Sequence, residues 1–105
     1  MVKEQLFADV IQDILTARKN GALYVNIVET SEDILRMYFK DGQLYHLRYG
    51  TAIGNDCLDI LEYYNLYSAT FFAGITAPDK PPADLPSTKE MLTKIRQLTK
   101  KIKVT

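Results

Sequence analysis

The chain has 105 residues, of which 47% are hydrophobic and 25% are charged, so it can bury one modest core and is not disordered by composition. Its 13 basic and 13 acidic residues cancel, which indicates neither an acidic nor a basic partner. The single cysteine cannot close an intramolecular disulfide. No stretch approaches the about 20 consecutive apolar residues that span a bilayer. We therefore expect one domain in a reducing, cytoplasmic setting, with no membrane span.

An amphipathic helix is predicted near the N-terminus. Apolar residues recur three and four positions apart, which places them on one stripe of a helix. They are Leu6, Phe7, Val10, Ile11, Ile14 and Leu15. Lys19-Asn20-Gly21 predicts the end of this helix, because Asn and Gly tolerate the left-handed conformation in which helices commonly end. Beyond it, apolar residues alternate with polar ones over residues 22–28 and predict a strand whose core face carries Leu23, Val25 and Ile27.

The pair Asp41-Gly42 predicts a β-hairpin, because both central positions of a type I′ turn need a positive φ. The two strands are residues 34–40 and 43–49, with Lys40 opposite Gln43 and the pairing continuing outward one residue at a time. Strict alternation then divides the side chains between two faces. The core face is expected to carry Leu35, Met37, Phe39, Leu44 and His46. The outward face is expected to carry Tyr38, Tyr45, Leu47 and Tyr49.

The middle of the chain predicts a second helix, another strand and a linker. Residues 56–64 carry Cys57, Leu58 and Leu61 at helical spacing, and Asn55 is suited to the N-cap position. Residues 67–75 alternate and predict a strand. All four prolines fall within residues 77–86, which therefore predict an extended linker.

The C-terminal segment, residues 87–105, predicts a basic amphipathic helix that begins with a capping box formed by Ser87 and Glu90. Its apolar stripe has coiled-coil spacing and is a candidate for self-association into a homodimer. The stripe consists of Met91, Ile95, Leu98 and Ile102. This segment holds 6 basic and 1 acidic residues, against 7 basic and 12 acidic in residues 1–86. Because the two parts have opposite charge, we expect this helix to dock on the rest of the chain or on a second copy. Binding to nucleic acid is less favoured, since no recognition motif accompanies the basic residues.

These elements predict an α+β fold with an N-terminal helix and an antiparallel sheet of about four strands. A helix is inserted before the last strand, and a Pro-rich linker leads to the C-terminal amphipathic helix. The corresponding division is a core over residues 1–76, a linker over 77–86 and a helix over 87–105.

The residues that usually carry chemistry form no catalytic or metal-binding pattern. With one histidine and one cysteine, the chain cannot supply a zinc tetrad of nitrogen and sulfur ligands, and we expect both His46 and Cys57 to pack inside the protein. The carboxylates of Asp56, Asp59 and Glu62 share one edge of a helix and do not converge on a cleft. We therefore expect no cofactor, no metal and no enzymatic activity.

Tyrosine is abundant, with seven residues in the chain. On the predicted registers, four of them share the outward sheet face with Arg36, and Tyr and Arg are favoured at the centres of protein interfaces. The candidate partner-binding residues are Tyr24, Arg36, Tyr38, Tyr45 and Tyr49. The alternative is that a helix packs across this face and makes the tyrosines ordinary residues at the edge of the core.

The order of these motifs resembles the PATAN domain, a family named for the N-terminal part of the bacterial regulator PatA and overlapping a family of unknown function. Gly21-Ala22-Leu23-Tyr24-Val25 resembles its opening strand, residues 37–46 its aromatic Asp-Gly hairpin, and Thr70-Phe71-Phe72 its closing strand. The Cys57-Leu58 helix resembles the segment between them. Where the family has a tryptophan before the last strand, this chain has Tyr63-Tyr64.

The resemblance covers about residues 6–75 and implies a non-catalytic adaptor in bacterial signal transduction. Its partner would be another signalling protein, and some family members are linked to surface motility. The alternative function is a small-ligand sensor with a pocket between the sheet and the helices, where His46 is among the polar groups.

Overall fold

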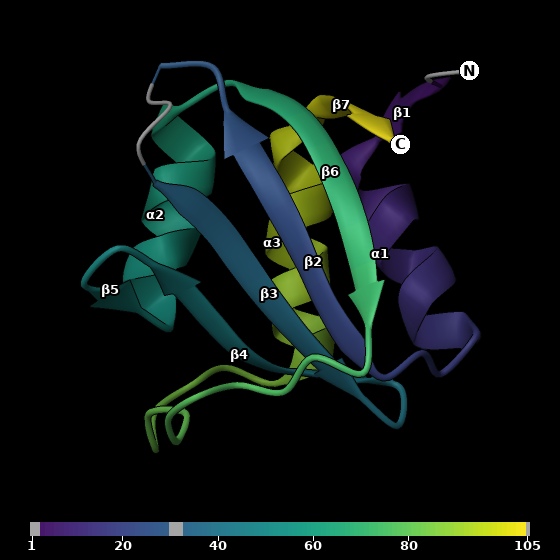
Figure 1. Cartoon of the computed structure of the whole chain (residues 1–105). Helices are drawn as coiled ribbons and strands as arrows, with labels where there is room; N and C mark the ends of the chain where they lie inside the picture. The colour runs from purple at the N-terminus through teal and green to yellow at the C-terminus, as the bar shows by residue number, and fades with distance from the viewer. Residues whose placement is uncertain (1–2, 30–32, 105) are drawn as a thin grey trace.

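The computed structural model describes residues 3–29 and 33–104 as a mixed sheet of seven strands with three helices on one face (Figure 1). Residues 1–2, 30–32 and 105 lie outside this description. The strands are β1 (Lys3–Leu6), β2 (Gly21–Ile27), β3 (Ile34–Lys40), β4 (Gln43–Tyr49), β5 (Ala52–Ile53), β6 (Leu66–Ala73) and β7 (Lys101–Val104). The helices are α1 (Phe7–Thr16), α2 (Asn55–Tyr63) and α3 (Thr88–Leu98).

The sheet order is β1-β7-β6-β2-β3-β4-β5. Neighbouring strands are antiparallel except for β6 and β7, which run parallel. Residues 74–87 join β6 to α3 without regular structure and are called the connector below. In Figure 1 the connector runs along the end of the sheet where β2 begins and β6 ends.

An α+β fold is confirmed, but the predicted sheet of about four antiparallel strands behind an N-terminal helix is wrong. β1 precedes α1, β5 follows β4, and β7 follows α3. These strands have only four, two and four residues, too few for alternation to be visible in the sequence. β1 and β7 pair with each other, with Lys3 opposite Val104. These two strands therefore form only because distant parts of the chain meet.

The first two helices bury the faces that their spacing predicts, except that Leu6 belongs to β1 and only precedes α1. The buried residues of α1 are Phe7, Ala8, Val10, Ile11, Ile14 and Leu15, and those of α2 are Cys57, Leu58 and Leu61. The prediction that Asn55 caps α2 is wrong, because Asn55 is the first helical residue. Gly54 occupies the N-cap with a φ of 61°, a conformation that favours glycine.

The helix predicted over residues 87–105 ends at Leu98, where Thr99 adopts a left-handed conformation with a φ of 50° and the chain continues into β7. The predicted cap forms at its start, since Ser87 Oγ accepts a hydrogen bond from the Glu90 amide at 3.2 Å. The stripe considered for self-association belongs to the core of its own chain. Met91, Ile95 and Ile102 are 0%, 2% and 1% exposed, and Leu98 packs against them. Three of its four residues are therefore buried in their own chain, and only the partly buried Leu98 leaves surface for a second copy.

Polar contacts also hold the basic C-terminal segment on the acidic part of the chain. They join Arg96 to Asp9 (3.0 Å), Lys94 to Asp59 (4.0 Å) and Lys100 to the carbonyl oxygens of Glu62 (2.9 Å) and Tyr64. The Lys100 ammonium thus lies at the C-terminal end of α2, where the helix dipole favours a cation. Exposed ion pairs contribute little each, so burial of the apolar face of α3 dominates this docking.

The Asp41-Gly42 turn forms as predicted, with φ values of 52° and 80°, and Lys40 pairs with Gln43. The register then shifts by one residue, because Phe39 pairs with Leu44 while Tyr38 pairs with His46. Tyr45 is therefore an extra residue in β4, a β-bulge.

The bulge reverses the predicted faces beyond Leu44. Leu47 is fully buried opposite Met37 in the core, whereas His46 joins Tyr38 on the other face. The predictions that His46 faces the core and that Leu47 faces outward are therefore wrong. Leu44 and Leu47 are three residues apart, so strict alternation would place them on opposite faces, and only an inserted residue lets both reach the core. Burying each leucine side chain stabilises the fold by about 1.5–3 kcal/mol.

We expect Ile95→Ala to lower the free energy of unfolding by about 2–5 kcal/mol, because it removes a buried side chain between α3 and the core. Urea unfolding followed by circular dichroism measures the change. Gln97→Ala, on the exposed side of the same helix, should change it by less than about 0.5 kcal/mol. Equal, small effects of Ile95→Ala and Gln97→Ala would contradict the packing of α3 on the core.

Candidate functional site

The sheet face without helices, called the outer face, carries an open row of side chains. Figure 1 views the sheet from this side, with the helices behind it. Phe72 of β6, Tyr24 of β2 and Arg36 of β3 lie across adjacent strands and form what is called the aromatic row below. The ring centres of Phe72 and Tyr24 are 5.0 Å apart, and the Arg36 guanidinium carbon lies 5.3 Å from the centre of the Tyr24 ring.

Stacking orders the aromatic row while leaving it accessible. Phe72 is 45% exposed and Arg36 is exposed, with Tyr24 half-buried between them. A tilted pair of rings and a cation over a ring each contribute about 0.5–1.5 kcal/mol, so these contacts favour the stacked arrangement of the three side chains. None of the ion pairs found among residues 3–29 and 33–104 includes Arg36.

The connector covers the β4 side of the outer face. Asp79 accepts hydrogen bonds from His46 Nε2 and from Arg48 Nη1, both at 3.1 Å. Beneath the connector, His46 is 0% exposed and stacks on Tyr38 with ring centres 5.9 Å apart. Asp79 thereby joins an irregular segment to two residues of a regular strand.

These contacts define the state of the covered side chains. Because a carboxylate accepts hydrogen bonds, Nε2 is the His46 nitrogen that carries a proton in this contact. Nδ1 is buried and has no hydrogen-bond partner in the described part of the chain. Burial, and then the neighbouring Tyr24, raises the pKa of Tyr38 above 10.0, against the smaller opposing effects of Arg36 and Arg48. Tyr38 is therefore a neutral packing residue.

The structure separates the five residues predicted to bind a partner. Tyr24 and Arg36 lie together in the aromatic row. Tyr38 is 3% exposed beneath the connector, Tyr45 is half-buried at the bulge, and Tyr49 packs against the core on the helix side. The one-residue shift at the bulge explains the place of Tyr49, because it moves this residue to the face opposite Tyr38. Tyr38 keeps its predicted face and is separated from the row by its burial.

Two residues of this face escaped prediction. Phe72 was visible in the sequence, since a strand that buries Ala69 and packs Phe71 on the core must direct Phe72 outward. Asp79 had no signal, because the connector has no periodicity and only the folded chain brings residue 79 to β4.

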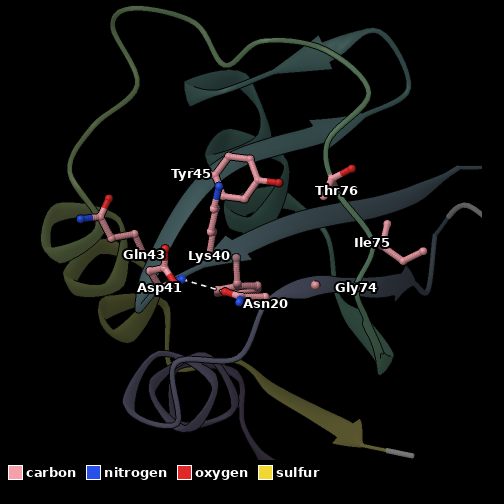
Figure 2. Close-up of a pocket in the computed structure, with 10 residues that line it drawn as sticks. Asn20, Lys40, Asp41, Gln43, Tyr45, Gly74, Ile75 and Thr76 are labelled. Carbon is pink, nitrogen blue, oxygen red and sulfur yellow. Dashed lines mark hydrogen bonds between the residues drawn. The ribbon is translucent and has the colours of Figure 1, made fainter.

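A pocket of about 700 Å³ opens at the end of the sheet, between the start of β2, the β3-β4 hairpin and the connector (Figure 2). It lies at the strand ends, whereas the predicted sensor pocket lay between the sheet and the helices. We call it the strand-end pocket. Two of the residues that line it are Lys40 and Tyr45.

Cys57 is a buried structural residue. Its side chain is 0% exposed, and Sγ donates to the Ala52 carbonyl oxygen at 3.5 Å. Burial, and then the carboxylate of Asp56, raises the pKa of the thiol from 9.0 to about 12. The prediction that Cys57 packs as a small hydrophobic residue is confirmed.

The acidic residues of α2 are exposed along the helix. Within residues 3–29 and 33–104, no group of three His, Cys, Asp or Glu side chains is placed to hold a metal ion. Over the same residues, no helix has both the length and the apolar character needed to cross a membrane.

We expect the native protein to resist thiol labelling. With a pKa of about 12, the thiolate fraction at pH 8 is on the order of 10⁻⁴, against about 0.1 for an unperturbed thiol. Reaction with 5,5′-dithiobis(2-nitrobenzoate) should therefore be at least about 100-fold slower in buffer than in denaturing urea, as followed by absorbance. Comparable rates in the two conditions would show that Cys57 is accessible.

We expect Asp79→Ala to lower the free energy of unfolding by about 1–3 kcal/mol, because it leaves the buried His46 Nε2 without an acceptor. Asp84→Ala removes an exposed carboxylate from the same connector and should change it by less than about 0.5 kcal/mol. Urea unfolding measures both variants, and equal effects would mean that Asp79 does not anchor the connector.

Comparison with known proteins leaves the chain without an assigned relative. No family model matches it, and neither a curated protein nor a solved structure does. The resemblance to the PATAN family therefore stays a prediction, and function has to be inferred from the residues of this chain.

Proposed function

We propose that this chain is a non-catalytic protein-interaction domain, an adaptor in bacterial signal transduction, which binds another signalling protein through the aromatic row. The observation that carries this proposal is the open row of Phe72, Tyr24 and Arg36 on a sheet face that no helix among residues 3–29 and 33–104 covers. The signalling context comes from the resemblance to the PATAN family.

The composition and rigidity of the row suit the centre of an interface. Tyr and Arg are enriched among the residues that dominate binding energy, and Phe72 adds apolar area that a partner can bury. Because Tyr24 already stacks on both neighbours, binding would cost less side-chain entropy than ordering three free side chains.

The groups around the row indicate the chemistry of the partner. Asn26 Nδ2 donates to Ser68 Oγ at 3.0 Å on the same face, which supplies a polar rim. The Arg36 guanidinium lies over Tyr24 and takes part in none of the ion pairs found among the described residues. A partner segment that places a carboxylate on Arg36 and apolar side chains on Phe72 would pair that guanidinium and bury the exposed ring.

The state of His46 and Cys57 supports a non-catalytic role. Both side chains are 0% exposed, so a substrate would reach neither without displacing the connector or opening the core. The raised pKa of Cys57 keeps its thiol protonated at neutral pH, and His46 Nε2 is engaged by Asp79.

Partner capture from a bacterial lysate, followed by calorimetric titration of each recovered partner, tests the aromatic row. Phe72→Ser and Arg36→Ser should each weaken binding by about tenfold or more, because each removes one end of the row. Tyr63→Ser is the matched control, since Tyr63 is 78% exposed on α2 and lies outside the row.

All three variants alter accessible side chains, and equal urea midpoints confirm that they fold as the wild type does. A partner that binds the wild type and Tyr63→Ser but not the row variants supports the proposal. Affinity unchanged in both row variants would exclude the row as the binding surface.

A further inference from the structure

The strand-end pocket is held open by hydrogen bonds between the three segments that form it. The Gly74 amide donates to the Asn20 carbonyl oxygen at 2.9 Å, and the Asp41 amide donates to Asn20 Oδ1 at 2.8 Å. The Ala77 amide donates to the Tyr45 hydroxyl oxygen at 3.1 Å. The start of β2, the hairpin and the connector are thus joined, and the pocket does not have to form when a ligand enters.

The size of the pocket suits a small organic molecule. Its volume of about 700 Å³ falls within the range of about 300–1,000 Å³ that is usual for such sites. Gly74 adopts a left-handed conformation with a φ of 81°, and nothing lies within 4 Å of the position where a Cβ would stand. Because Tyr45 is the bulged residue, its ring is free to form a wall of the pocket.

Hydrogen-bond donors with spare capacity gather at the pocket. Lys40 lines it and takes part in none of the ion pairs found among the described residues. The Tyr45 hydroxyl accepts from Ala77, so its own proton remains to be donated. In Figure 2, Lys40 lies between Tyr45 and Asn20, and the Tyr45 hydroxyl points toward Thr76. An ammonium and a phenol hydroxyl together suit a carboxylate.

The apolar surface of the pocket further narrows the class of ligand that it suits. Ile75 is 40% exposed and lines the pocket together with the Tyr45 ring. One carboxylate, that of Asp41, belongs to a lining residue and offsets part of the Lys40 charge. A small inorganic anion would gain little here, whereas an anion with an apolar body would also bury Ile75.

We propose that the strand-end pocket binds a small organic carboxylate. The carboxylate accepts hydrogen bonds from Lys40 and the Tyr45 hydroxyl, and an apolar, ring-sized body packs against Ile75. Binding here is separable from binding at the aromatic row, because Lys40 and Ile75 do not belong to that row.

Two probes of one shape test the proposal, 2-naphthoate and its neutral counterpart 2-naphthamide. Titrations are followed by the backbone and side-chain amide signals in ¹⁵N-correlation NMR spectra. In the wild type, 2-naphthoate should shift the signals of Asn20, Gly74 and Thr76, and should bind about tenfold more tightly than the amide.

Lys40→Met should remove this preference, so that both probes bind with the weaker affinity. Lys80→Met removes the same charge from the connector outside the pocket and should keep the tenfold preference. Ile75→Ser should weaken both probes, because it removes the apolar contact. Equal affinities in the wild type, shifts at other residues, or no binding of either probe at millimolar concentration would overturn the proposal.

Discussion

The extra residue of β4, Tyr45, determines which side chains of β4 lie on each face of the sheet. It lets Leu44 and Leu47 both enter the core, and the same shift places His46 beside Tyr38 on the outer face. The Leu44 amide, next to the bulge, donates to Thr88 Oγ1 at 3.1 Å, so the first residue of α3 satisfies a backbone donor beside the irregularity. The bulge is thus coupled to the docking of α3.

The C-terminal segment completes the core that the rest of the chain begins. Met91 and Ile95 pack with the helices and the sheet, and Ile102 enters from β7 between β1 and β6. The last strand pairs with the first, which joins both ends of the described chain at one edge of the sheet. Apolar burial drives this closure, and opposite charges on the two parts orient it.

The connector divides the outer face into a covered half and an open half. Asp79 holds it over His46 and Arg48, while the aromatic row on β6, β2 and β3 stays accessible. The same connector forms one wall of the strand-end pocket through residues 74–76. Both proposed sites therefore border one irregular segment that a few hydrogen bonds hold against a rigid sheet. Each site also uses a basic side chain that takes part in none of the ion pairs found among the described residues, Arg36 in the aromatic row and Lys40 in the strand-end pocket.

Local patterns determined the helical stripes of α1 and α2, the Asp41-Gly42 turn, the Ser87 cap and the irregular connector, because each depends on residues close in sequence. They also placed Tyr24 and Arg36 on one face, since these residues precede the bulge. Only the tertiary structure decided the bulge, the short strands β1, β5 and β7, the burial of Tyr38 and the contact of Asp79 with His46. The pairing of β1 with β7 and the contact of Asp79 with His46 join segments far apart in sequence, whose free energy no local window contains. The bulge and β5 lie within and beside the β3-β4 hairpin, but the bulge depends on burying both Leu44 and Leu47 in the shared core, and β5 has only two residues.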